Sequence, residues 1–182
     1  VPTLTFKKFR GEPGIVSTIC RLCKKGNESV KHLLSNCEMF AATLYKRRQD
    51  RVLQMIIFKF FHKFKIIAEN PPWFSKVVIK PYYETEELEL YWDIPEYSGY
   101  DDKPEKGPLR PDGKIINKMS KCIFVLEMSI PWITNRRSKL EEKISKYKNI
   151  IQTLKIENPG YSVKQLTFIV DCMGGYSKDL IE

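Results

Sequence analysis

The sequence of 182 residues predicts an α/β fold, with a short mixed sheet flanked by helices and a small cysteine-rich segment in front. Two observations carry this prediction. Apolar side chains recur at helical spacing in residues 40–68 and again after Trp132. Apolar runs of strand length lie between and after these helical segments, the longest at residues 120–132.

Three cysteines and a histidine dominate the first segment, residues 1–40. In "CRLCKKGNESVKHLLSNC", Cys20, Cys23, His32 and Cys37 are spaced C-x2-C-x8-H-x4-C, which is a ligand spacing of tetrahedral Zn2+ sites. Four protein ligands leave no open position, so we expect a structural zinc knuckle that stabilises a segment poor in apolar residues. Disulfide pairing is the alternative, but three cysteines with a spaced histidine in a basic intracellular chain favour zinc.

The second segment, residues 41–69, is expected to be a connecting helix that packs on the core. Its apolar stripe consists of Leu53, Ile56, Ile57, Phe60, Phe64 and Ile67. "NPPW" at residues 70–73 ends the helix, because proline cannot continue it. Lys59, His62, Lys63 and Lys65 interrupt the apolar stretch, so we expect no membrane span and a soluble intracellular protein.

The third segment, residues 70–182, is expected to form the α/β domain. Strands are predicted in "WFSKVVIKPYY" (73–83), "LELYWDIP" (88–95), "SKCIFVLEMSIPW" (120–132) and "VKQLTFIVDCMGG" (163–175). The turn-rich residues 96–108 predict an exposed loop. A helix follows Trp132, and Ser138 with Glu141 fits a capping box at its start.

The net charge of +9 is unevenly distributed along the chain. Residues 1–80 hold 16 Lys and Arg against 5 Asp and Glu (+11), residues 81–112 hold 3 against 10 (−7), and residues 113–182 hold 12 against 7 (+5). A basic first half suits a polyanionic partner, and the acidic stretch could gather divalent cations. A merely solvated lysine-rich surface is the alternative.

Glu127 is the one acidic residue inside the apolar run "CIFVLEMSI". Burying an ionised carboxylate costs several kcal/mol unless it is paired or binds a metal. Asp112, in "LRPDGKII", precedes it by 15 positions, and a hairpin with a short turn would lay the two segments side by side. Two carboxylates on adjacent strands would form an oxygen-rich site for Mg2+ or Mn2+.

Lys143 and Lys146 lie on the helix that follows Trp132, at the edge of its apolar stripe. A lysine there could orient or deprotonate an attacking water, or stabilise the charge on a phosphate. A buried salt bridge between Glu127 and a helix lysine, without a metal, is the alternative for the acid. For Asp112 alone, the alternative is a turn carboxylate beside proline.

Taken in order, the zinc-type knuckle, "RPD", "FVLEMSIPW" and "KLEEKISKYKNI" resemble the carboxy-terminal part of the polyproteins of early-branching, site-specific non-LTR (LINE) retrotransposons. In that family a restriction-like endonuclease of the PD-(D/E)xK superfamily follows the reverse transcriptase. The resemblance covers residues 19–175, and the order of the motifs is more specific than any one of them. It implies a PD-(D/E)xK restriction-endonuclease-like core in residues 70–182, behind a CCHC zinc knuckle.

The resemblance also implies roles for individual residues. Asp112 and Glu127 would bind the catalytic Mg2+ or Mn2+, and Lys143 or Lys146 would complete the site, because the family carries this lysine on the helix after the acidic strand. The implied enzyme is a Mg2+-dependent endodeoxyribonuclease of the nucleus that nicks double-stranded target DNA for target-primed reverse transcription. Its implied partners are target DNA, the element's RNA and the reverse transcriptase domain of a larger parent polyprotein.

Three positions depart from the family pattern. Glu127 stands where Asp is common, Gly113 where a β-branched residue is common, and Gln49 where related sequences often carry His. A catalytically inactive or domesticated zinc-containing nucleic-acid-binding module is therefore the alternative function, and a brace for the reverse transcriptase is a third. The residues expected to contact phosphates are Arg21, Lys24, Lys25, Arg47, Arg48, Arg136 and Arg137.

Overall fold

A computed structural model describes residues 2–96 and 109–176 and shows a mixed α/β architecture with a five-stranded sheet. Nearly all of the loop expected at residues 96–108 lies outside the described residues. The strands are β1 (Tyr82–Glu84), β2 (Leu88–Trp92), β3 (Gly113–Asn117), β4 (Cys122–Ser129) and β5 (Ser162–Ile169). They lie in the order β1-β2-β3-β4-β5, antiparallel from β1 to β4, with β5 parallel to β4.

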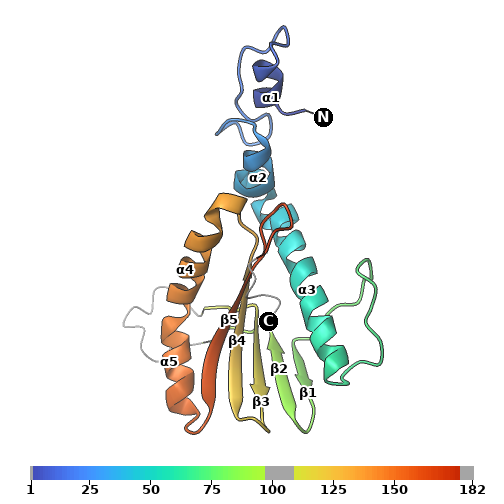
Figure 1. Ribbon diagram of the computed structural model, residues 1–182, viewed down its shortest axis with the longest axis vertical. Helices are drawn as coiled ribbons and strands as arrows, with labels where there is room; N and C mark the ends of the chain where they lie inside the picture. Colours follow the sequence, from blue (N-terminus) through green and yellow to red (C-terminus); the bar gives the residue numbers. More distant parts are fainter. Residues whose placement is uncertain (1, 97–108, 177–182) are drawn as a thin grey trace.

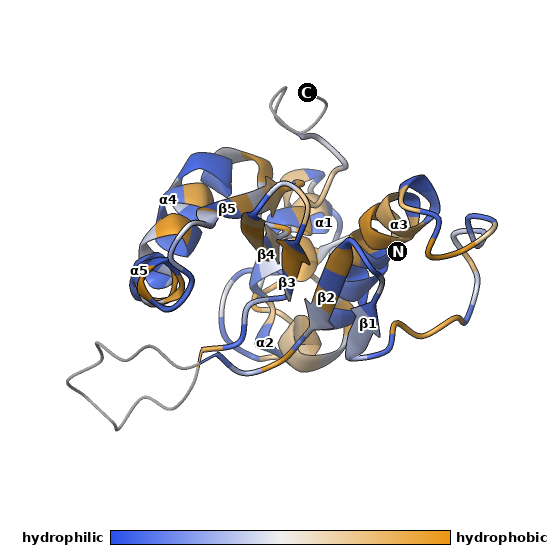
Figure 2. Cartoon of the chain, turned by 90° about the horizontal axis from the view of Figure 1, so that it is seen from below, coloured by the Kyte–Doolittle hydropathy of each residue, from blue (hydrophilic) through white to orange (hydrophobic). Residues whose placement is uncertain are grey.

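Helices cover both faces of this sheet (Figure 1). The described helices are α1 (Leu4–Phe9), α2 (Glu38–Phe40), α3 (Lys46–Lys63), α4 (Arg136–Lys146) and α5 (Lys148–Glu157), with π-helical turns at His32–Asn36 and Ala41–Tyr45 and a short 3-10 turn at Ile133–Asn135. Figure 2, seen along the sheet from below, shows α3 on one side of the strands and α4 with α5 on the other. Among the described residues, no helix has the length and apolar character that crossing a membrane requires.

The core between α3 and the sheet is built from residues at helical spacing. Leu53, Ile57, Phe58 and Phe61 are the buried residues of α3, and the last three pack against Leu88, Leu90, Ile115 and Leu126 of the strands. The predicted stripe contained Leu53 and Ile57 but missed Phe58 and Phe61. Phe61 is fully buried and its ring lies 4.6 Å from that of Tyr83, so the buried face is rotated toward the β1 edge of the sheet.

The opposite face of the sheet packs against α5 and the junction before it. Ile123, Val125 and Val163 of β4 and β5 meet Tyr147, Ile150 and Leu154. Because β4 contributes Ile123 and Val125 to this core and Leu126 to the other, it is covered on both faces, as its continuous apolar sequence predicts. Glu127 is placed inside this doubly covered strand.

Two local predictions are wrong. Residues 73–83 do not form one strand: only Tyr82–Glu84 pairs with β2, and Val78 and Trp73 are 80% and 73% exposed. Ser138 and Glu141 do not form the predicted capping box, because α4 begins two residues earlier, at Arg136. The Ser138 hydroxyl donates to the Asn135 carbonyl, and Glu141 pairs with Arg137. The helix after Trp132 is further divided in two at Tyr147, whose side chain is fully buried.

Candidate functional site

The four cysteine and histidine side chains predicted as zinc ligands come together. The ligand atoms of Cys20, Cys23, His32 and Cys37 all lie within 4.8 Å of one another, and the Cys23 thiol is 3.2 Å from His32 Nε2. Ligands about 2.3 Å from a tetrahedral ion are separated by about 3.8 Å, so this spacing fits one metal ion. Among the described residues these four are positioned to hold a metal, and their thiol and imidazole groups are compatible with structural zinc.

The backbone of a tight turn presents the first two cysteines. The Cys20 amide donates to the Gly26 carbonyl, the Lys24 amide donates to the Cys20 carbonyl, and Lys24 adopts a left-handed φ of 58°. Burial raises the pKa of the Cys20 thiol, but backbone amides, that of Cys23 foremost, outweigh burial and lower it to about 7. A thiol with a lowered pKa gives up its proton to a metal more readily.

The other two ligands are His32, at the start of the short π-helical turn His32–Asn36, and Cys37, which directly follows this turn. Tyr45 ties this turn to the start of α3: its hydroxyl accepts from the Cys37 amide and lies within hydrogen-bond distance of the carbonyls of His32 and Leu33. On the other side of the cluster Glu28, buried to 1% exposure, accepts from the amides of Leu4 and Arg21 and from the Arg21 guanidinium. These contacts lower the pKa of Glu28 to about 2, the Arg21 guanidinium being the main cause.

Glu127 lies on β4, and Asp112 directly precedes the neighbouring strand β3. β3 and β4 pair antiparallel with Gly113 opposite Leu126, so continuing that register by one residue places Asp112 opposite Glu127. Asp112 Oδ2 accepts from the Met128 amide at 2.7 Å and from Gln49 Nε2 of α3 at 3.3 Å. Gln49 was noted in the sequence only as a departure from a family pattern, and the structure makes it a direct partner of Asp112.

Lys143 of α4 completes this group of charges. Its ammonium donates to Glu127 Oε1, and its backbone carbonyl accepts from Gln165 of β5 at 3.0 Å. Lys146 is one turn further on and donates instead to the Tyr147 hydroxyl at 2.7 Å, which in turn donates to the Arg110 carbonyl at 2.8 Å. Of the two lysines, Lys143 is therefore the one in contact with a predicted catalytic acid.

Burial and the proximity of the two carboxylates determine the electrostatics of this pair. Burial, followed by the neighbouring Glu127 carboxylate, raises the pKa of Asp112 to about 6 despite the Met128 amide and Lys143. Glu127 is 2% exposed, and its Oε2 has no hydrogen-bond partner among the described residues. The Tyr147 hydroxyl donates to the Arg110 carbonyl at 2.8 Å, and burial together with the neighbouring Glu127 carboxylate raises its pKa. A buried carboxylate oxygen without a partner beside a second carboxylate fits an Mg2+ or Mn2+ ligand set.

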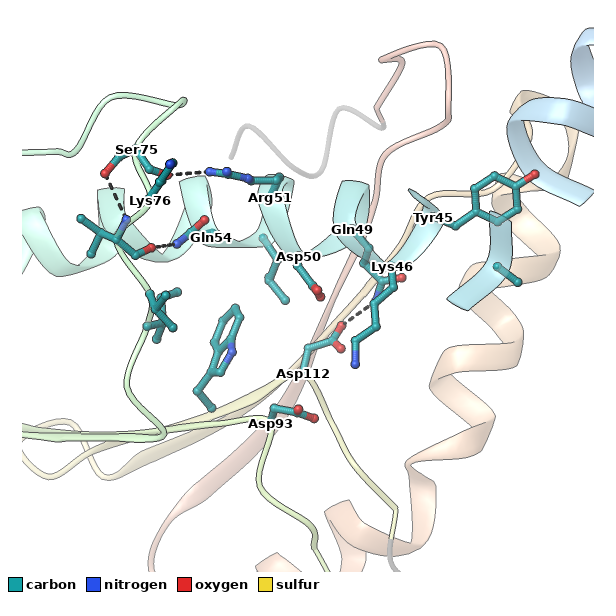
Figure 3. A pocket seen from close by; sticks show the side chains of 16 residues that line it. Tyr45, Lys46, Gln49, Asp50, Arg51, Gln54, Ser75, Lys76, Asp93 and Asp112 are labelled. Carbon is teal, nitrogen blue, oxygen red and sulfur yellow. Dashed lines mark hydrogen bonds between the residues drawn. The ribbon is translucent and has the colours of Figure 1, made fainter. Parts of the chain in front are cut away.

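A hollow of about 650 Å3 opens beside Asp112, between α3 and the strands. Figure 3 shows Lys46, Gln49 and Asp50 of α3 facing Asp93 and Asp112. Burial raises the pKa of Asp50, and Asp93 adds to the effect. Sequence reasoning did not single out Lys46, Asp50 or Asp93. The i, i+3, i+4 spacing of Lys46, Gln49 and Asp50 was the available signal for one polar helix face.

The seven residues expected to contact phosphates come from three segments: the knuckle, the start of α3 and the start of α4. Arg21 and Lys25 pair with Glu28 and Glu38 of the knuckle, while Arg136 lies 3.6 Å from Asp171 and Arg137 pairs with Glu141. The half-buried Arg48 donates to the carbonyls of Leu34 and Ile130, so it links the knuckle to the end of β4. Lys24 and Arg47 are exposed.

Comparison with known proteins leaves the site to be judged on its own geometry. No protein-family model matches the chain, and no curated protein matches it either. The resemblance to retrotransposon endonucleases thus remains a prediction from the order of the motifs. The structure itself provides a metal-type cysteine and histidine cluster and, in the sheet, two adjacent carboxylates with a lysine.

Proposed function

We propose that the protein is a metal-dependent DNA endonuclease whose site is formed by Asp112, Glu127 and Lys143. The observation that carries the proposal is the buried Glu127 Oε2, which has no partner among the described residues although it lies in the strand that faces Asp112. An ion pair with Lys143 alone satisfies only one oxygen of that carboxylate. A divalent cation would satisfy the other and reduce the repulsion between the two acids.

The residues of the site have separate tasks in this proposal. Asp112 and Glu127 hold Mg2+ or Mn2+, which when bound would activate a water and offset charge on the scissile phosphate. The Met128 amide and Gln49 fix the orientation of Asp112. Lys143 forms an ion pair with Glu127 and places a positive charge where negative charge develops on the phosphate.

The order of motifs in the chain supports a narrower proposal. The fold is of the PD-(D/E)xK type, the ion of the knuckle is Zn2+, and the enzyme nicks double-stranded target DNA in the nucleus during target-primed reverse transcription. It does so as the C-terminal part of a retrotransposon polyprotein, with the reverse transcriptase domain and the element's RNA as further partners. The basic first half of the chain, at +11 over residues 1–80, supports a role in holding nucleic acid.

Nicking of supercoiled plasmid by the purified chain tests this proposal. With Mg2+ or Mn2+ present we expect conversion to open circles, and no conversion without an added divalent ion. Asp112→Asn, Glu127→Gln and Lys143→Met should each lower the rate by about 100-fold or more, because each removes a charge on which the transition state depends.

Glu141→Gln and Lys139→Met are matched controls, since both residues are on α4 and form only surface ion pairs. Their nicking rates should stay within about twofold of wild type. Equal residual nicking by wild type and Asp112→Asn would assign the activity to a contaminant and remove Asp112 from the site.

A second function, a nucleic-acid-binding module without catalysis, is favoured by one observation. The contact between Lys143 and Glu127 already neutralises the buried charge without a metal. Calorimetric titration with Mn2+ separates the two functions. Heat of binding that disappears in Asp112→Asn supports the nuclease, whereas no heat in wild type together with no nicking supports the module.

A further inference from the structure

A groove on the outer side of α3 displays aromatic and basic side chains together. We define this aromatic groove by Arg47, Arg51 and Met55 of α3 and by Trp73, Phe74 and Lys76 of the segment that follows it. Its volume is about 590 Å3, and none of the described residues that line it is acidic. Because Arg47, Arg51 and Met55 are spaced by four, they form one stripe of the helix, separate from the stripe that packs on the sheet.

The segment that carries the aromatic residues is held in place. Arg51 donates to the Ser75 carbonyl at 2.6 Å, Gln54 donates to the Val77 carbonyl, and the Ser75 amide closes a turn on the Pro72 carbonyl at 2.8 Å. Trp73 and Phe74 lie in that turn with their ring centroids 5.7 Å apart and their planes at 85°. Although the backbone is fixed, the two side chains remain 73% and 65% exposed.

Exposed aromatic rings beside basic side chains match one type of ligand. Unpaired nucleic acid offers flat apolar bases for stacking and phosphates for Arg and Lys. In a duplex the bases are already stacked on each other, so Trp73 and Phe74 would have nothing to stack on. An acidic protein segment could pair with Arg47 and Lys76, but it would not specifically require two exposed aromatic rings held side by side.

The groove also leads to the proposed nuclease site. Arg51 and Lys76 line both this groove and the hollow that contains Asp112, and Figure 3 shows both side chains beside Ser75, with Asp50 and Gln49 on the side of α3 nearer Asp112. A strand lying in the groove is thereby led toward Asp112. We propose that the aromatic groove binds an unpaired stretch of DNA by stacking on Trp73 and Phe74; the choice of DNA over RNA rests on the proposed nuclease function.

Binding of a fluorescein-labelled oligo-dT of about 15 nucleotides to the full chain, without divalent ions, tests the groove. Trp73→Ala combined with Phe74→Ala should weaken this binding about tenfold or more and change binding to a hairpin duplex by less than about twofold. Trp73→Phe with Phe74→Tyr should retain most of the affinity, because it keeps two stacking rings. Met119→Ala, also at an exposed apolar residue (75%), should leave it unchanged.

Three results would overturn the inference. Unchanged oligo-dT binding in the double alanine variant would remove the nucleic-acid ligand and point to a protein partner. An equal loss for duplex and single strand would show that stacking on unpaired bases is not the interaction. Tighter binding of oligo-rU than of oligo-dT would overturn the choice of DNA. Oligo-dT binding by the wild type together with no nicking would refute the nuclease and leave the groove standing. Asp112→Asn keeps the groove intact, so it should bind oligo-dT like the wild type.

Discussion

Asp112→Asn should make the protein more stable at neutral pH while abolishing its proposed activity. The folded chain raises the pKa of Asp112 from 3.8 to about 6, so the ionised form is disfavoured by folding. A shift of about two pKa units corresponds to about 3 kcal/mol. Because Asp112 is only partly buried, solvent screening reduces the expected gain to about 1–2 kcal/mol.

The sign of the effect fixes its pH dependence. An acid whose folded-state pKa is raised costs no stability below its unfolded value, and the cost is complete above its folded value. The advantage of Asp112→Asn should therefore be nearly full above about pH 6.5, near half at about pH 5 and absent below about pH 3. Urea unfolding of both proteins between pH 5 and 8, without added divalent ions, measures this difference.

Adding Mg2+ provides the second half of the test. A metal that binds only the folded wild type raises its free energy of unfolding, while the variant without the ligand should not respond. The wild type should thus recover part of the difference as Mg2+ is increased. A variant that is less stable than wild type at pH 7.5, or an advantage independent of pH, would refute the claim that the ionised Asp112 is held at an energetic cost.

Three further predictions concern the supports of the two sites. Tyr147→Phe removes the donor to the Arg110 carbonyl and should lower the free energy of unfolding by about 1–2 kcal/mol in urea titrations; a smaller loss than in an Ile151→Val control would contradict it. Glu28→Gln should lower the free energy of unfolding by about 1–2 kcal/mol at pH 7. The lowered pKa of Glu28, about 2, contributes stability that is complete above about pH 4.5 and disappears as the pH falls through 2, so the urea midpoints of wild type and variant should converge in acid. Cys37→Ser should abolish binding of one zinc per chain and increase amide exchange near the knuckle, leaving β4 protected; unchanged zinc content would exclude Cys37 as a ligand.

The elements that could be predicted from the sequence are those with a local signal. The C-x2-C-x8-H-x4-C spacing predicted the cysteine and histidine cluster. The continuous apolar run around Glu127 predicted β4 and its burial on both faces. The hairpin expected between Asp112 and Glu127 is present as the β3–β4 pair. In each case the chemistry and the spacing along the chain are sufficient, because the partners are close in sequence.

The features that the sequence did not reveal depend on tertiary context. Residues 73–83 have strand-like composition, but Arg51 and Gln54 draw the backbone of Ser75 and Val77 against α3, and only Tyr82–Glu84 reaches β2. Likewise, the polar face of α3 becomes part of a site because the fold brings Asp93 and Asp112 against it. Both residues are far from α3 in the sequence. The helical spacing of polar residues identifies a polar helix face, but it does not predict which residues of the fold lie against that face.

The strand order, which follows the order of the chain, has a consequence for how the molecule assembles. Strands β1 to β4 are neighbours in the order in which they occur in the chain, so β3, directly after Asp112, and β4, which carries Glu127, can pair before the rest of the chain has emerged from the ribosome. Lys143 follows later in the chain, and its helix α4 packs on β5 as well as β4, with Gln165 of β5 donating to the Lys143 carbonyl. A nascent or truncated chain that stops before Ser162 would accordingly carry both acids without the strand that helps to position Lys143, and under the proposed function we expect it to be inactive.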